Sequence, residues 1–312
     1  MEHLSVLKES VQKYLELKGG EIVVDTTLGL GGHALEMVQA IGKEGKLYAF
    51  DQDERNMEEA KRRLKDYEGQ ITYIHDNFRY LKSRVTGEVD AILFDLGLSS
   101  PHVDEADRGF SFQQDGPLDM RFDPRSDLTA ATILNTYSEE KLAEIFFKYA
   151  EEKQSHKLAR YIVQDREEEL FESTLKFAAF VERVLRQKRA SKKSKAHPAT
   201  RVFQALGIEV NNEMGVLEEA LEAAMEIVKV GGRIVLISYH SIEDRLVKHF
   251  FRKLENPPVS SPEQAAFQTH GDPIVEKMTR KPVIPTDQEL EENPRSRSAK
   301  LRAYKKLLPY PS

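Results

Sequence analysis

Residues 21–33 read EIVVDTTLGLGGH, an apolar run that leads directly into a glycine-rich turn. The run Glu21–Asp25 is rich in β-branched side chains and predicts a buried strand. The glycines of the turn Asp25–His33 tolerate positive φ angles and let the backbone approach a ligand closely. Because ligands of open α/β sheets bind beyond the carboxyl ends of the strands, this turn is where we first expect a binding site.

Three further apolar runs also predict strands. Between the second and third strands of the chain, Glu54–Tyr67 carries apolar residues at helical spacing. Strand, helix and strand in this rhythm imply parallel strands joined by right-handed crossovers, and so an α/β fold with a doubly wound sheet. The three runs are Lys46–Asp51 (KLYAFD), Ile71–His75 (ITYIH) and Val89–Asp95 (VDAILFD).

The rhythm stops after Asp95, where residues 99–127 form a long polar stretch. Loops of this length are usually functional or disordered. Helical patterns follow, and Thr136 with Glu139 predicts a capping box at the start of one of them. We expect these helices over 139–149, His156–Glu169 and Thr174–Lys188.

Strand character returns only at Arg233–Tyr239 (RIVLISY), and Ser298–Tyr304 predicts a last strand. A helix is predicted over Gly215–Val230, because Gly231 and Gly232 mark its end. The simplest organisation is a helical domain inserted after the fourth strand. We therefore predict a discontinuous core domain at 1–105 and 200–312 and an inserted, mostly helical domain at 106–199.

Composition limits the location and the chemistry. Hydrophobic residues make up 40% of the 312 residues, but no run of eighteen apolar residues occurs and the start lacks an apolar signal core. We therefore expect a cytoplasmic protein with no membrane partner. The chain has no cysteine, which excludes disulfides, thiolate zinc sites and cysteine nucleophiles. No feature indicates an obligate protein partner.

Charge is distributed unevenly along the chain, whose formal net charge is -6. Arg183–Arg201 holds eight Lys or Arg and no acid, and Asn293–Lys306 holds six and no acid. Two basic islands on an acidic body indicate either a local anionic partner or simply solvated surface.

Side chains suited to bind a cofactor follow four successive strands. Asp25 precedes the glycine-rich turn, Asp51 ends the second strand, Phe78 follows the third and Asp95 ends the fourth. Asp51 lies twenty residues after Gly31, where a carboxylate accepts both hydroxyls of a ribose. Each feature alone also fits a purely structural role, but together they predict a nucleoside cofactor.

Two cofactors fit the turn. Gly29, Gly31 and Ala34 match the dinucleotide fingerprint, which indicates a nicotinamide-dependent dehydrogenase. Asp25, however, is placed to accept from an amino group and would repel a pyrophosphate. This carboxylate and the basic islands favour S-adenosylmethionine and a macromolecular substrate.

The polar stretch carries five aspartates that need interpretation. Their spacing is not that of a calcium loop, and three arginines lie among them, so internal salt bridges are favoured over a metal site. The aspartates are Asp104, Asp107, Asp115, Asp119 and Asp123, and the arginines are Arg108, Arg121 and Arg125.

Seven sequence blocks, in order, span nearly the whole chain. They are Asp25–His33 (DTTLGLGGH), Asp95–Pro101 (DLGLSSP), Arg108–Phe112 (RGFSF), Asp115–Arg121 (DGPLDMR), His197–Ala205 (HPATRVFQA), Ser238–Arg245 (SYHSIEDR) and Asn293–Arg302 (NPRSRSAKLR). In these blocks the chain resembles the ribosomal RNA small-subunit methyltransferase H family, also called MraW.

The resemblance implies a class I, Rossmann-like methyltransferase. Its donor is expected to be S-adenosylmethionine, and its substrate N4 of a cytidine in the decoding centre (P site) of 16S rRNA in the small ribosomal subunit. His102 is one expected cofactor contact, at a position where the family usually has glutamine. The other contacts implied by the family are Gly31, Gly32, His33, Asp51, Phe78 and Asp95.

The lack of cysteine also bears on the mechanism. Methylation of a ring carbon of cytosine normally needs a thiolate that adds to the ring, whereas an exocyclic amine needs only acceptors for its hydrogens. Asp95 is the first candidate acceptor, although a role in cofactor binding alone is favoured over direct catalysis. Ser99 with Ser100, Asp119 and His240 are further candidates, and His240 also reads as a satisfied strand-end histidine.

The RNA must present an unstacked base. We expect the inserted helices and Arg183–Arg201, including Lys188, Arg189, Lys192 and Lys193, to grip phosphates around it. Phe110 and Phe112 either stack on the base or belong to the core of their loop. Two alternatives remain. One is a methyltransferase that acts on ribose or on DNA, although the motifs typical of ribose and of DNA methyltransferases are absent. The other is a noncatalytic assembly factor.

Overall fold

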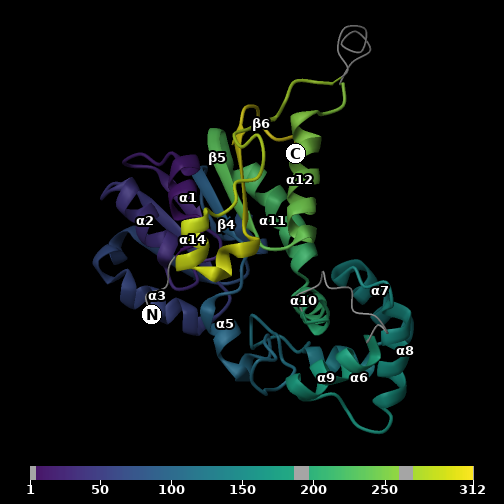
Figure 1. Cartoon of the computed structure of the whole chain (residues 1–312). Coiled ribbons are helices and arrows are strands. Elements are labelled where there is room, and N and C mark those ends of the chain that lie inside the picture. Colours follow the sequence, from purple (N-terminus) through teal and green to yellow (C-terminus); the bar gives the residue numbers. More distant parts are fainter. Residues whose placement is uncertain (1–4, 186–196, 260–269, 312) are drawn as a thin grey trace. The chain divides into compact units, whose positions relative to one another are not determined.

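The computed structural model describes residues 5–185, 197–259 and 270–311, except for the side chain of Ser100. The chain forms two compact units, each described here by itself (Figure 1). The sheet unit consists of Met1–Gly97 and Met214–Ser312, and the helical unit of Leu98–Glu213. The helical unit thus begins before and ends after the segment 106–199 expected from the sequence.

The sheet unit is built on seven strands in the order β3-β2-β1-β4-β5-β7-β6. The strands from β1 to β5 run parallel, whereas β7 is antiparallel to both of its neighbours. The predicted doubly wound α/β fold is therefore confirmed. The strands are β1 (Ile22–Asp25), β2 (Lys46–Asp51), β3 (Ile71–His75), β4 (Val89–Asp95), β5 (Val228–Ser238), β6 (Val275–Lys277) and β7 (Lys300–Lys306).

The strand order reverses between β1 and β4. From β1 the chain adds β2 and β3 on one side, and then β4 and β5 on the other. Open α/β sheets bind ligands at such a switch point, outside the carboxyl ends of the strands. The last residues of the two central strands are Asp25 and Asp95, so the fold brings these carboxylates to the switch point.

Alternate residues of each strand face opposite sides of the sheet, as the period of two requires. Val23 lies in the core shared with α1, α2 and α3, and Val24 in the core shared with α4, α11 and α12. The helices visible around the sheet in Figure 1 therefore form two covering layers. They are α1 (Lys8–Leu15), α2 (Gly32–Ile41), α3 (Glu54–Arg63), α4 (Leu81–Arg84), α11 (Glu213–Ile227) and α12 (Ser241–Glu255), with α14 (Asp287–Glu292) in the C-terminal segment.

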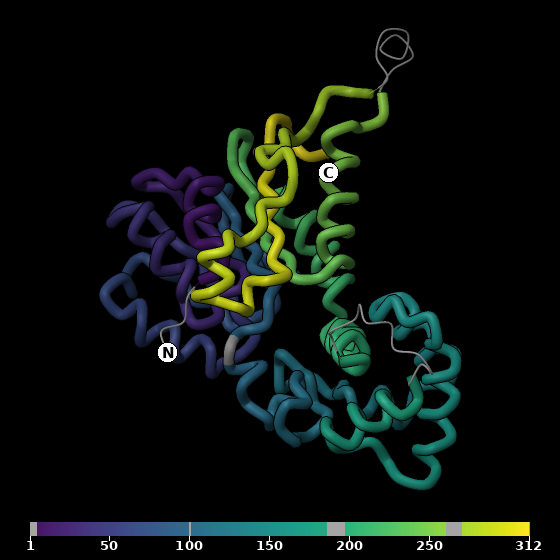
Figure 2. The backbone as a smooth tube through the Cα atoms, viewed as in Figure 1, coloured from purple at the N-terminus to yellow at the C-terminus, as the bar shows by residue number. Residues whose placement is uncertain are grey.

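The C-terminal segment completes the sheet. In Figure 2 its yellow tube runs beside the green β5, and Ser238 pairs with Lys300 across the two strands. Short 3₁₀ helices connect the elements of the unit: η1 (Lys65–Gln70), η2 (Phe78–Tyr80) and η4 (Pro294–Ser298).

The boundary between α11 and β5 differs from the sequence prediction. Helix α11 ends at Ile227 rather than Val230, because Val228 already pairs with Val89 in the sheet. The two glycines expected to end the helix lie inside β5, where the register shifts and Gly231 has φ +85°. Strand pairing thus prevails over the local helix-end signal.

The helical unit has its own hydrophobic core, drawn from Leu118 to Val210. Its predicted capping box is wrong: Thr136 ends α6, and the side chain of Ser138 caps α7 by accepting from the backbone N of Lys141. Helix α9 begins at Thr174 as predicted. The helices are α5 (Ser100–Asp104), α6 (Ala130–Thr136), α7 (Glu139–Ala150), α8 (Ser155–Asp165), α9 (Thr174–Leu185) and α10 (Ala199–Val210), with η3 (Ala106–Arg108).

Among the described parts of the chain, no helix combines the length and the apolar character that crossing a membrane requires.

Candidate active site at the carboxyl edge of the sheet

The glycine-rich turn joins β1 to α2 and is tightly packed at Gly31. Gly31 has φ +77°, and a Cβ on it would lie 3.2 Å from the side chain of Leu64 and 3.3 Å from that of Ala60. The backbone N of Gly29 donates to Asp51 Oδ2 at 2.8 Å, which ties the turn to the end of β2. Helix α2 then starts without a side-chain cap, so its first N–H groups are left available for a ligand.

Asp25 is buried at the start of this turn. Its Oδ1 accepts from the backbone N of Thr27 at 3.1 Å. Its Oδ2 is buried and has no hydrogen-bond partner among the described residues. Burial raises the pKa of Asp25 to about 7, with smaller contributions from the carboxylates of Asp95 and Asp51. A buried acceptor without a donor is unusual in native structures and marks this oxygen as a ligand contact.

Asp51 and Phe78 frame the same edge. Besides Gly29, Asp51 accepts from the backbone N of Asp53 at 2.8 Å, so both of its oxygens are held by backbone amides. The ring of Phe78, half-buried after β3, meets the ring of Phe94 edge-on with centroids 5.8 Å apart. The backbone and the sheet thus fix the position of both side chains.

Asp95 is the centre of a polar network at the end of β4. Its backbone N donates to Thr27 Oγ1 at 2.9 Å, and its Oδ1 accepts from the hydroxyl of Tyr239 at 2.8 Å. Its Oδ2 lies 3.7 Å from Nε2 of His33. Sequence reasoning missed Tyr239 and Thr27 as partners of Asp95.

Burial controls the protonation of the groups around Asp95. It lowers the pKa of His33 to about 4, so this imidazole is neutral near pH 7. Burial, together with the neighbouring Asp95, raises the pKa of Tyr239 well above its usual value. Tyr239 therefore stays a proton donor, and its hydroxyl orients the side chain of Asp95.

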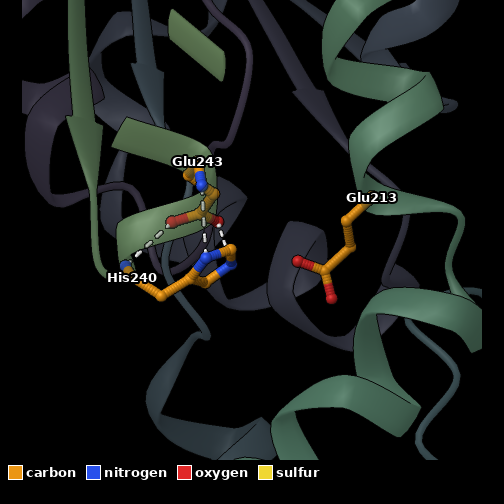
Figure 3. A group of neighbouring side chains, drawn as sticks. All are labelled: Glu213, His240 and Glu243. Atoms are coloured by element: carbon orange, nitrogen blue, oxygen red, sulfur yellow. Dashed lines mark hydrogen bonds and ion pairs between the residues drawn. The ribbon is translucent and has the colours of Figure 1, made fainter. Parts of the chain in front are cut away.

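His240 forms the N-cap of α12, as Figure 3 shows by its dashed lines to Glu243. The backbone N of Glu243 donates to His240 Nδ1 at 3.2 Å, and Nε2 lies 3.1 Å from Glu243 Oε1. The other oxygen of Glu243 accepts from the backbone N of Tyr239 at 2.8 Å and of His240 at 3.2 Å. This capping pair fixes the chain at Tyr239. The His-x-x-Glu spacing was the sequence signal for it, and the sequence prediction did not use it.

Three predicted site residues belong to the helical unit. Ser99 Oγ lies 2.9 Å from His102 Nδ1 in a capping box that starts α5. The ring of His102 packs against Phe110 and Phe122, with centroids 5.3 and 5.2 Å away. His102 therefore has a structural environment of its own within this unit.

Asp119 is held by an arginine two residues further on. Arg121 donates to Asp119 Oδ1 through Nε at 2.9 Å and to Oδ2 through Nη2 at 2.7 Å. Burial acts to raise the pKa of Asp119, but these hydrogen bonds outweigh it and the pKa is lowered. Asp123 pairs in the same way with Arg125. The internal salt bridges expected from the sequence are confirmed for these two aspartates.

The aromatic and basic residues considered for RNA binding lie in different surroundings. Phe110 and Phe112 pack against the core of the helical unit, which supports the interpretation as core residues. In the second basic island, Lys306 donates to the carbonyls of Met225 and Val228, so its role is structural. Lys188, Arg189, Lys192 and Lys193 lie outside the described residues.

The known proteins that are similar to the chain include methyltransferases. A profile of the MraW methylase family matches residues 1–307. A protein of Streptococcus dysgalactiae subsp. equisimilis, "Ribosomal RNA small subunit methyltransferase H", is 43% identical over an alignment of 312 positions that covers 98% of each chain.

Solved structures with similar folds include an rRNA methylase from Streptococcus thermophilus, at 15% identity, TM-score 0.43, and 99% and 100% coverage of the two chains. A candidate methyltransferase from Streptococcus mutans in complex with SAH has 13% identity, TM-score 0.46, and 98% and 100% coverage. The family profile and the curated relative both extend over nearly the whole length, and the chain belongs to the MraW methylase family.

Proposed function

We propose that this methylase transfers a methyl group from S-adenosylmethionine to N4 of a cytidine in 16S rRNA. The target is proposed to lie in the decoding centre (P site) of the small ribosomal subunit. Membership of the methylase family and the name of the Streptococcus dysgalactiae relative support this substrate class. A cytoplasmic location is part of the proposal, because it is where we expect the substrate.

The observation that carries the proposal is the unpartnered Oδ2 of Asp25. The amino group of the methionine moiety is the donor that this buried carboxylate lacks, and a cation restores the charge that burial opposes. A nicotinamide dinucleotide would instead bring a pyrophosphate toward Asp25. The donor set at this edge therefore fits S-adenosylmethionine better.

The remaining donor contacts are proposed at residues that hold the turn. Gly31 leaves space where a Cβ would meet Leu64, and Gly32 starts α2 with free N–H groups. Asp51, at the end of β2 and held by the backbone N of Gly29 and of Asp53, is proposed to accept from the ribose hydroxyls. We include His33, Phe78 and Asp95 here from the family resemblance, and His102 as an expected contact.

When bound, the donor supplies an electrophilic methyl group on a sulfonium. Asp95 is proposed to accept a hydrogen bond from the exocyclic amine of cytosine, which localises the lone pair on nitrogen. The hydroxyl of Tyr239 holds the carboxyl group of Asp95, and Thr27 holds its backbone N. The absence of cysteine excludes a thiolate that adds to the ring, which favours the amine over a ring carbon.

Ser99, Asp119 and His240 stay proposed contacts for the reacting nucleotide. Of these, His240 has an observed structural role as the cap of α12. We propose that the helical unit recognises the RNA around the target. Its independent core and its position as an insertion into the methylase chain support a separate recognition role.

The test is to incubate the protein with labelled S-adenosylmethionine and small ribosomal subunits that lack modifications. Digestion and mass mapping are expected to find the label on N4 of one cytidine. Label on ribose, on a ring carbon or on another base would contradict the proposed reaction. An absence of label, with folded protein and intact subunits, would contradict the substrate.

A further inference from the structure

A second concave site lies in the sheet unit, at the end of β5. This cleft has a volume of about 320 Å³ and is formed where three chain segments meet. Tyr239 and His240 come from the start of α12, Ile284 and Pro285 from the segment before α14, and Arg297 and Lys300 from the junction of η4 with β7. We call it the Arg297 cleft.

The Arg297 cleft adjoins the proposed site of methyl transfer. Tyr239, which lines the cleft, donates its hydroxyl to Asp95 Oδ1 at 2.8 Å. Strand β5, which ends one residue before Tyr239, pairs with β4, and Ile237 is in register with Asp95. One tyrosine side chain therefore connects the cleft with the carboxylate proposed to hold the target amine.

The formally charged side chains that line the cleft, Arg297 and Lys300, are both basic. None of the residues that line it is acidic. Lys300 lies 3.7 Å from Asp244 Oδ2, but Arg302 already occupies that carboxylate at 2.7 Å from Oδ1. Arg297 is exposed and makes no hydrogen bond or ion pair with any residue in the described ranges. A cleft with an available guanidinium and a loosely held ammonium is suited to bind a phosphate.

Other lining residues of the cleft are apolar or aromatic. Ile284 is 65% exposed, which is high for an isoleucine beside a cleft, and Pro285 lies next to it. With the rings of Tyr239 and His240, these side chains offer flat and apolar surface of the kind on which nucleobases pack.

We propose that the Arg297 cleft binds the RNA nucleotide adjacent to the target cytidine. Arg297 and Lys300 contact its phosphate, and its base packs on Tyr239 and the apolar wall. The neighbour is favoured over the target, because the ring of Tyr239 lies between the cleft and Asp95. The volume is at the small end of ligand pockets and suits a single nucleotide. This inference rests on the proposed RNA substrate.

The experiment compares Arg297→Gln, Lys300→Gln and a control, Arg280→Gln. Arg280 is also an exposed arginine of the C-terminal segment, but it does not line the cleft. Binding of unmodified small ribosomal subunits is measured across a series of salt concentrations, together with KM, kcat and the affinity for S-adenosylmethionine.

Each cleft variant is expected to raise KM for the subunit several-fold and to reduce the salt slope by about 0.7, the value for one lost contact to single-stranded phosphate. The kcat, the donor affinity and the unfolding midpoint are expected to match those of Arg280→Gln. If the cleft variants equal the control in slope and KM, while the wild type methylates RNA, the cleft proposal is overturned and the proposed function stands. A loss confined to donor affinity also overturns it. If the wild type neither binds nor methylates subunits, the proposed function itself fails.

Discussion

At the end of β1, Asp25 presents a buried carboxylate oxygen that has no hydrogen-bond partner among the described residues. A pKa of about 7 places this group at the boundary between its charged and neutral forms under physiological conditions. Such perturbed groups cluster at functional sites. We therefore expect the charged form of Asp25 to lower the stability of the free protein and to raise its affinity for a cationic ligand.

Replacing Asp25 by Asn tests the effect on stability. Between pH 4 and 7 the folded protein retains a proton that the unfolded chain has lost, so stability falls as the pH rises toward 7. Above pH 7 the buried charge costs up to roughly 4 kcal/mol. We expect Asp25→Asn to exceed the wild type in free energy of unfolding by at least about 1 kcal/mol at pH 8, and by little at pH 4. Urea unfolding in the absence of donor measures the free energy of unfolding at both pH values. The same pH dependence in the wild type and in Asp25→Asn would contradict the raised pKa of Asp25.

The same variant is expected to lose donor affinity at least about tenfold, because a charge-assisted hydrogen bond is removed. For the wild type, affinity for S-adenosylmethionine should fall as the pH drops below 7 and Asp25 takes up a proton. Titrations at pH 6 and pH 8 separate this effect from general instability.

Tyr239 acts on Asp95 through a single hydroxyl. Tyr239→Phe keeps the ring and removes the 2.8 Å hydrogen bond to the carboxylate. Loss of a hydrogen bond to a charged group costs about 1.5–3 kcal/mol, so we expect kcat to fall about 10- to 100-fold. Donor affinity should change less than about threefold. Unchanged kcat would show that the hydroxyl does not orient Asp95.

The sequence predicted the carboxylates of this site but not their partners. Asp25, Asp51 and Asp95 could be placed because each ends a predicted strand. Tyr239 is 144 residues from Asp95 in the chain, and only the pairing of β5 with β4 brings them together. No local pattern contains that contact.

At the scale of elements, local signals located the parallel strands well. The runs predicted for β2, β3 and β4 match the observed bounds. The predictions that were wrong concern residues that belong to a neighbouring element. Val228 pairs in the sheet and is not part of α11. Thr136 is the last residue of α6, so it cannot be the N-cap of α7. The position of β7, antiparallel between β5 and β6, depends on long-range pairing and could not be predicted from the sequence of β7 itself.

The loop after β4 packs directly against the end of β5. A Cβ on Gly97 would lie 2.6 Å from the ring of Tyr239, so this contact requires glycine. We expect Gly97→Ala to displace the ring, to lower kcat as Tyr239→Phe does, and to cost about 1–3 kcal/mol of stability. Gly69→Ala is the matched control, because nothing lies within 4 Å of a Cβ there.

The coupling of the two positions is measurable. In the Tyr239→Phe background, Gly97→Ala should lower kcat little further, because the hydroxyl is already gone. Fully additive effects on kcat would show that Gly97 acts by another route.

At the scale of the molecule, each unit is built around its own core. The two hydrophobic clusters of the sheet draw only on residues of the sheet unit, and the third only on residues 118–210. Domains with separate cores can in principle fold alone. Apart from the proposed contact at His102, the donor site and the unit proposed to read RNA are therefore separable.

Removal of the helical unit tests this separation. A chain in which residues 98–213 are replaced by a flexible glycine-serine linker is expected to fold and to bind S-adenosylmethionine within about tenfold of the full chain. It should not methylate small ribosomal subunits. Circular dichroism and calorimetry check the first expectation, and label transfer the second. Failure of the folded, shortened chain to bind the donor would mean that the helical unit supplies part of the donor site.

The central claim is that the carboxyl edge of β1 and β4 holds a methyl donor. It is tested most directly by calorimetric titration of the full chain with S-adenosylmethionine at pH 8, alongside a nicotinamide dinucleotide. The account predicts saturable binding of one S-adenosylmethionine per chain and no heat from the dinucleotide. Well-folded protein that takes up no S-adenosylmethionine, or that binds the dinucleotide instead, would contradict it.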